Sequence, residues 1–204
     1  MMRELRALVL LTALTACGAR DDLRAASADT TTVAAAPVYV DSFVPLDEAL
    51  RRFRADSAPQ RVTQLEPAAP SADSLVRVFA NAVERRDSLA LRAYALSAAE
   101  FAWLYYADSP LAKAPYELDP QMMWFQMQEQ SAKGRTRVLA RLGRQALRIA
   151  GLDCAAPRAQ GASAIHESCI LRLTEGGAAV ERRLFGSLIE REGRWKFVGY
   201  GNDF

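Results

Sequence analysis

The chain has 204 residues, half of them apolar, which suffices for one domain with a substantial core plus additional segments. Its 26 basic and 24 acidic residues give a net charge of +2. Because the charges balance and the basic residues are spread along the chain, the sequence argues against nucleic acid or a strongly charged molecule as partner.

Residues 1–16 have the pattern of a secretory signal peptide. Arg3 and Arg6 precede a short apolar run from Ala7 to Leu14. This run is far shorter than the stretch of about 20 residues that a permanent membrane-spanning helix needs. We therefore expect the segment to direct export and to be removed.

The signal peptide is followed by a cysteine in a specific context, Leu14-Thr15-Ala16-Cys17. This sequence resembles the lipobox of bacterial lipoproteins. The resemblance implies cleavage before Cys17, a diacylglycerol on its thiol, and a mature protein held in the cell envelope, facing the periplasm, with the membrane as its partner. Gly18 in place of aspartate favours the outer membrane, by resemblance to enterobacterial sorting. The alternative is an ordinary signal peptide followed by an unrelated cysteine.

Two further segments precede the main domain. Residues 17–37 are rich in Ala, Asp, Thr and Ser, a composition that buries too little apolar surface to order, so they predict a flexible tether. Residues 38–70 carry Leu46, Leu50 and Phe53 at helical spacing, followed by a proline-containing linker. We expect a short amphipathic helix that packs on the main domain or, alternatively, on a partner.

The main domain is predicted over residues 71–204 and begins with helices. The first has an apolar face at helical spacing, and Asp73 is expected to cap it. A second, shorter helix is expected to begin after a cap at Asp87 or Ser88.

Further helical turns follow in the middle of the chain. Ser97 and Glu100 have the spacing of a capping box. Asp119-Pro120 places a capping residue before a proline at the first helical position. We expect Gly134 to break this helix and a last helical stretch to continue to Gly143.

After residue 145 the apolar periodicity changes from helical to alternating, which predicts strands. Gly176-Gly177 and Glu192-Gly193 are turn signals between them. The predicted strands lie around residues 147–151, 169–174, 180–191 and 195–200, the third of them long. Helices followed by an antiparallel meander indicate an α+β fold.

Cys154 and Cys169 would lie in an oxidising compartment after export, so we expect a disulfide between them. Free thiols are the alternative, and a catalytic thiol is a third interpretation. His166, expected to be solvated in a loop between strands, is the single histidine, and its spacing from the cysteines does not match a zinc site. We therefore expect neither a metal nor another cofactor.

Two parts of the main domain carry a family resemblance. One is Val83-Glu84-Arg85-Arg86-Asp87 with the Ser-Leu-Ala-Leu-Arg that follows, and the other is Gly193-Arg194-Trp195-Lys196-Phe197-Val198. They resemble the opening and the close of nuclear-transport-factor-two-like (SnoaL-like) domains, over residues 71–204. The resemblance implies a cystatin-like cone in which N-terminal helices pack on a curved antiparallel sheet and enclose a pocket. The middle of this chain is more helical than is usual in that family.

Six residues are candidates for lining such a pocket: Trp103, Tyr105, Tyr106, Asp108, Met123 and Trp124. A tyrosine beside a carboxylate can polarise a carbonyl and move a proton, whereas the alternative is aromatic packing with the hydroxyls at the surface. The methionines suit an apolar ligand or a core. Four arginines of the predicted strand region would bind an anion if they converged inside the cone, and otherwise face solvent: Arg148, Arg172, Arg182 and Arg183.

The sequence contains no nucleophile elbow, phosphate loop or dinucleotide fingerprint. Our first hypothesis is therefore a non-catalytic, lipid-anchored envelope protein that binds a small apolar ligand or another envelope protein. One alternative is an isomerase- or hydrolase-like enzyme that uses the cone pocket. Another is a structural domain that forms a homodimer through its sheet face.

Overall fold

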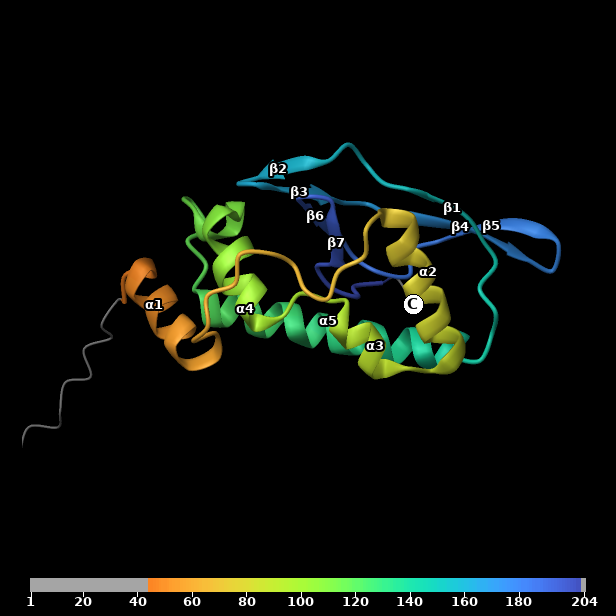
Figure 1. The fold of residues 1–204 in the computed structure, drawn as a ribbon, viewed down its shortest axis with the longest axis horizontal. Helices are drawn as coiled ribbons and strands as arrows, with labels where there is room; N and C mark the ends of the chain where they lie inside the picture. The colour runs from red at the N-terminus through yellow and green to blue at the C-terminus, as the bar shows by residue number, and fades with distance from the viewer. Residues whose placement is uncertain (1–43, 203–204) are drawn as a thin grey trace, which may run out of the picture. The chain divides into compact units, whose positions relative to one another are not determined.

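The computed structural model describes residues 44–202, which belong to one compact unit, Ser42–Phe204 (Figure 1). The predicted signal peptide over residues 1–16, Cys17 and the tether to residue 37 lie outside the described residues. The helix predicted within residues 38–70 is present and runs from Leu46 to Ser57.

Helices make up the first two thirds of the described chain. In order they are α1 (Leu46–Ser57), α2 (Ala72–Arg85), α3 (Ser88–Ala93), α4 (Ala98–Glu100), the π-helix η1 (Phe101–Tyr105), the 3₁₀ turns η2 (Tyr106–Asp108) and η3 (Pro110–Ala112), and α5 (Pro120–Leu142). The strands that follow are β1 (Ile149–Asp153), β2 (Arg158–Gln160), β3 (Ser163–His166), β4 (Ile170–Glu175), β5 (Ala178–Arg182), β6 (Leu188–Arg191) and β7 (Arg194–Phe197). Helices followed by antiparallel strands confirm the predicted α+β class.

The strands form two antiparallel sheets, in the orders β1-β4-β5 and β2-β3-β6-β7. In Figure 1 the β4–β5 hairpin extends to the right of α2, while β6 and β7 lie behind the linker that precedes α2. The predicted tight turns join β4 to β5 and β6 to β7. The predicted single meander is wrong, because its two hairpins belong to different sheets.

The long strand predicted over residues 180–191 is also wrong, because the chain leaves one sheet and enters the other between β5 and β6. Successive side chains of a strand point to opposite faces. Leu184 and Phe185 are nevertheless both buried in the same core, and the backbone N–H of Gly186 donates to the carbonyl of Gly199. The chain must therefore bend here to bury both side chains.

Sequence reasoning missed the short β2–β3 hairpin, and with it the position of His166. This residue ends β3 and does not lie in a loop. Its ring packs on Trp195 with centroids 4.6 Å apart.

Two apolar clusters hold the unit together. In the first, Phe79 of α2 meets Phe185 and Phe197 with ring centroids 5.3 and 5.8 Å apart. In the second, Phe53 of α1 meets Phe101 of η1 at 5.5 Å. The amphipathic helix α1 therefore packs within the compact unit, which was the first of the two expectations for it.

The helix caps follow the predictions with one exception. Asp87 caps α3, and Asp119 caps α5 by accepting from the backbone N–H groups of Gln121 and Met122. The exception is α2, which is capped by Ser71 because its hydroxyl accepts from the N–H of Ser74; the predicted cap, Asp73, lies in the first turn.

Gly134 does not break α5, which runs unbroken through it. The glycine serves packing instead: a Cβ at this position would overlap the carbonyl oxygen of Tyr200. The side-chain amide of Asn202 also donates to the Gly134 carbonyl over 2.9 Å. The absence of a side chain thus allows residues 200–202 to cross directly over the helix.

The Gly134→Ala substitution is a test of this contact. Alanine normally favours a helix by about 1 kcal/mol over glycine. Here we expect the opposite sign, a loss of about 2 kcal/mol or more in the free energy of unfolding, because the methyl group must displace the backbone of Tyr200. Urea unfolding followed by circular dichroism measures the change.

The control is Thr136→Ala, an exposed position on the same helix, which should leave stability unchanged or raise it slightly. A Gly134→Ala protein as stable as the Thr136→Ala protein would show that the close approach is not required.

Candidate functional site

A cavity of about 280 Å³ lies between η1, the loop before α5, one face of α5 and the segments on either side of β6–β7. It is the candidate site. Its lining residues carry no charge and combine apolar, amide and hydroxyl groups: Tyr105, Leu111, Leu118, Met123, Gln126, Met127, Gln130, Ser131, Gly186, Ser187, Val198, Gly199 and Gly201.

Helix α5 supplies one wall through its periodicity. Met123, Met127 and Ser131 recur every four residues, so they lie along one side of the helix. The same side continues to Gly134, where the chain beyond β7 crosses. Ser131 is buried, and its hydroxyl accepts from the N–H of Tyr200 over 3.3 Å. The helix therefore holds the opposite wall of the cavity at short range.

The π-helix η1 supplies Tyr105. A π-helical turn holds an extra residue and often occurs at functional sites. The Tyr105 carbonyl accepts from the buried side-chain amide of Gln160 over 3.0 Å, which joins η1 to β2. Burial raises the pKa of the Tyr105 phenol, partly opposed by nearby Arg158, so the hydroxyl stays protonated at neutral pH. A protonated phenol donates and accepts hydrogen bonds but does not act as a base there.

The wall of the cavity opposite α5 contains three glycines, Gly186, Gly199 and Gly201, which add no side chain to the space. A Cβ on Gly199 would lie 3.5 Å from Cβ of Ser131, and one on Gly186 would lie 3.2 Å from the Gly199 carbonyl oxygen. A Cβ on Gly201 would meet no atom within 4 Å. Space at Gly201 is therefore open, and a larger residue there would reduce it.

The lining offers hydrogen-bonding and apolar groups and carries no charged side chain. The Ser131 hydroxyl accepts hydrogen bonds from the Arg135 guanidinium and from the backbone N–H of Tyr200. Neither partner is a histidine or a carboxylate that could activate it as a nucleophile. The amides of Gln126 and Gln130 can donate and accept, while the methionines and leucines offer apolar contact. The cavity suits a small uncharged ligand with both apolar and hydrogen-bonding parts.

Of the six predicted pocket residues, Tyr105 and Met123 line this cavity. Trp124 instead packs on Phe101 with centroids 5.1 Å apart, in the second apolar cluster. The indole N–H of Trp103 donates to the carbonyl of Ala58 over 3.0 Å.

The remaining two predicted residues also lie outside the cavity lining. The Tyr106 hydroxyl donates to the Leu118 carbonyl over 2.8 Å, and burial raises the pKa of this phenol to about 12. Asp108 is exposed and lies against Gly161, where a Cβ would overlap its carboxylate. Tyr106 and Asp108 therefore do not form a shared acid–base site at this cavity.

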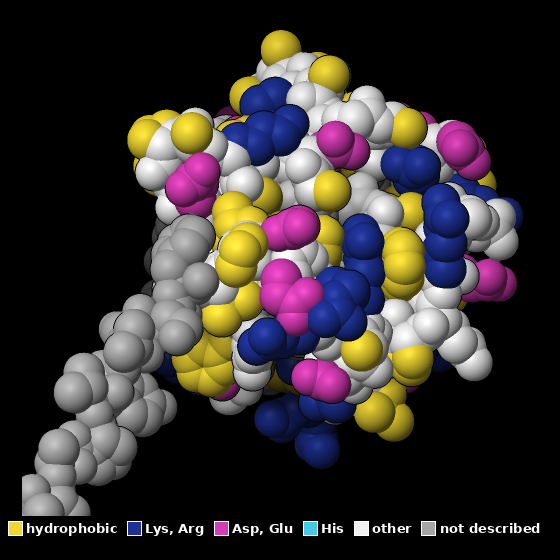
Figure 2. Space-filling view, turned by 90° about the vertical axis from the view of Figure 1, so that its left-hand side faces the viewer, with side chains coloured by type: hydrophobic (Ala, Val, Ile, Leu, Met, Phe, Trp, Pro, Cys, Tyr) yellow, Lys and Arg dark blue, Asp and Glu magenta, His cyan; other side chains and the backbone are white. Residues whose placement is uncertain are grey.

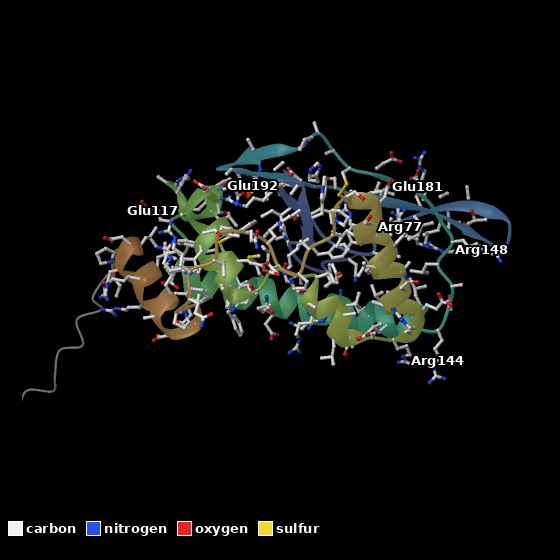
Figure 3. All side chains as sticks on the ribbon, viewed as in Figure 1. Arg77, Glu117, Arg144, Arg148, Glu181 and Glu192 are labelled. Carbon is white, nitrogen blue, oxygen red and sulfur yellow. A yellow bond between two sulfur atoms is a disulfide. The ribbon has the colours of Figure 1, made fainter. Side chains whose placement is uncertain are left out.

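The four arginines considered for anion binding are exposed: Arg148, Arg172, Arg182 and Arg183. Figure 3 shows Arg148 at the outside of the unit. Arg172 pairs with Asp153 and Arg182 with Glu175, over 3.0 and 2.9 Å. They face solvent, which was the alternative expectation.

Cys154 and Cys169 lie at disulfide-bonding distance, as predicted (Figure 3). Cys169 also lines a second hollow of about 360 Å³, which shares Gly186, Ser187 and Gly201 with the candidate site. The two hollows therefore adjoin.

Sequence reasoning missed a buried ion pair between Glu100 and Lys196, whose side chains are 2% and 1% exposed. The Lys196 ammonium donates to both Glu100 oxygens, over 2.9 and 2.7 Å. The carboxylate also accepts from the backbone N–H groups of Glu66 and Ser97, over 2.7 and 2.8 Å. Burial lowers the pKa of Lys196, and the attraction of Glu100 opposes that shift.

Residues 44–202 hold no group of three or more His, Cys, Asp or Glu side chains that could bind a metal ion. Within the same range, none of the helices is both long and apolar enough to cross a membrane. No protein-family model, curated protein or solved structure matches the chain.

The Glu100→Gln substitution tests the role of the ion pair. It leaves the buried Lys196 ammonium without its counter-charge, so we expect the free energy of unfolding to fall by about 3–5 kcal/mol. Denaturant unfolding of the two proteins measures this difference.

Glu129→Gln is the matched control, since it removes the same charge from the exposed Glu129–Lys133 pair. That change should be below about 1 kcal/mol. Equal, small losses in both variants would contradict a structural role for the buried pair.

Proposed function

We propose that the protein is a lipid-anchored protein of the cell envelope whose globular unit is a non-catalytic binding module. The ligand site is the cavity beside Tyr105 and α5. The binding role is carried by the lining, which joins uncharged amides and hydroxyls to apolar side chains, and the anchor is supported by Leu14-Thr15-Ala16-Cys17. Such a mixture is typical of sites that bind small molecules.

The ligand class is narrower than the apolar ligand expected from sequence. Gln126 and Gln130 are exposed at the rim of the cavity, where their amides can hydrogen-bond to water or to the polar groups of a ligand. A volume of about 280 Å³ is slightly below the range of about 300–1,000 Å³ that is usual for such sites, so the ligand must be small. We therefore infer a small, neutral molecule with one apolar side and several hydrogen-bonding groups.

We also propose that the unit is related in fold to nuclear-transport-factor-two-like domains. The helix α2, the cap of α3 at Asp87 and the closing β6–β7 hairpin are the features that support it. The 23-residue helix α5 and the division into two sheets are departures from the expected cone.

The ligand site is tested with a chain from Gly18 onward, exported without its lipid. Native mass spectrometry should show a mass that is lost on denaturation. The Gly201→Trp variant should lose most of that mass, because Gly201 lines the cavity and no neighbouring atom keeps an indole at this position out of it.

Leu89→Trp is the control, because it adds the same side chain at a position on α3 that is 75% exposed. It should keep the bound mass. The site would be contradicted if the unaltered chain carried no bound molecule, or if the Gly201→Trp variant kept it. If the protein converted the bound molecule to a product, the unit would be an enzyme and not a non-catalytic binding module.

The anchor is tested by metabolic labelling of the full chain with an alkyne-bearing palmitate in a bacterial host. Label should enter the unaltered protein and be absent from the Cys17→Ala variant. The Cys154→Ala/Cys169→Ala double variant should keep the label, because the lipid belongs on Cys17. Label that persists in Cys17→Ala would disprove the proposed anchor.

A further inference from the structure

An apolar patch lies on the outer side of α5, close to its beginning. It consists of Met122 and Phe125, which are 49% and 60% exposed. Together with Asp119 and Gln121 they line a shallow hollow of about 340 Å³. This patch is smaller than the apolar patches of a few hundred Å² that by themselves mark a contact surface, so its occupant has to be argued from its position.

The patch adjoins the part of the unit that receives the chain from its N-terminal side. Helix α1 begins at Leu46, only a few residues into the described chain, and its Phe53 packs against Trp124 with centroids 6.4 Å apart. Trp124 is in the same turn of α5 as Met122 and Phe125, but it packs inward toward α1 whereas those two side chains are exposed. Figure 2 looks onto the end of the unit that carries α1, where hydrophobic side chains lie among basic and acidic ones.

We propose that Met122 and Phe125 rest on the lipid surface that holds the Cys17 anchor, an inference that depends on the proposed lipid anchor. The two side chains insert among the lipid headgroups, and the unit thereby takes one orientation on the membrane. Aromatic side chains favour this interfacial region, and a thioether adds apolar area.

The length of the chain before α1 supports a lipid surface as the occupant. Cys17 is separated from Val44 by 26 residues. The tether expected from the composition of this segment would, at that length, have an end-to-end distance of about 30 Å. An anchored unit therefore stays close enough to the membrane for a weak contact to be populated, because the tether raises its local concentration.

The size of the patch argues against a second copy of the chain. Two side chains of this kind offer on the order of 200 Å². A stable protein–protein interface needs about 800 Å² on each partner. The area is sufficient for a contact that a tether assists and insufficient for a free-standing dimer.

The test places a fluorescent reporter in the patch. The chain from Cys17 onward is coupled through its Cys17 thiol to maleimide lipids in vesicles of phosphatidylethanolamine and phosphatidylglycerol. This coupling is specific because Cys154 and Cys169 are paired. In the Phe125→Trp variant, we expect blue-shifted emission and additional quenching when the vesicles contain brominated lipids.

Leu89→Trp again serves as the control, and both variants retain the same three native tryptophans. It should show neither the shift nor the additional quenching. Equal quenching in the two variants, or none in either, would overturn the proposal. If the emission of Phe125→Trp shifted more as the number of protein molecules per vesicle rose, and brominated lipids did not quench it, the patch would contact another copy of the chain and the proposal would be overturned.

The ligand measurement uses a chain without lipid, and the palmitate measurement uses the full chain in cells. Failure of the quenching test alone therefore refutes the membrane contact and leaves the cavity and the anchor standing. Failure of palmitate labelling removes the anchor on which the contact depends.

Discussion

The fold depends on one interaction that is unfavourable unless every partner is in place, the buried ion pair of Glu100 and Lys196. Each charge has left water, so each requires hydrogen bonds in fixed positions. Glu100 receives them from Lys196 and from the backbone of Glu66 and Ser97. Three distant parts of the chain, the linker before α2, the start of α4 and the last strand, must therefore meet at one carboxylate. An apolar contact would tolerate small shifts of these parts, whereas this arrangement does not.

The ion pair also connects the two walls of the cavity. The turn that begins at Glu100 continues into η1 and reaches Tyr105, and Val198 follows Lys196 by two residues. Both Tyr105 and Val198 line the cavity. A disturbance at the ion pair would thus move both walls, although neither charge belongs to the lining. The cavity lining is uncharged although two charged side chains are buried close to it. This is possible because Glu100 and Lys196 neutralise each other.

Local signals in the sequence predicted local structure well. The caps at Asp87 and Asp119 and the capping box at Ser97 depend on neighbouring residues, so they could be read directly. Lys196 could not be recognised as buried, because it alternates with apolar residues as a solvent-facing strand residue does and its partner is 96 residues away. Gly134 was misinterpreted for the same reason: its role is set by Tyr200, which no pattern in α5 reveals. Tyr105 and Met123 were found from their residue types, whereas the glutamines and glycines of the lining carry no such signal.

The β2–β3 hairpin lies between Cys154 and Cys169 in the sequence, and the Cα atoms of these two cysteines are 4.0 Å apart. That separation is close to the 3.8 Å between consecutive Cα atoms of any chain. In topological terms the hairpin is an insertion between β1 and β4 that is closed at its base by the cysteine pair. The strands of the hairpin are nevertheless constrained, because Gln160 bonds to the Tyr105 carbonyl, Ile165 is buried in the second apolar cluster and β3 pairs with β6. Only the exposed turn at Gly161-Ala162, between β2 and β3, is therefore open to an inserted recognition loop.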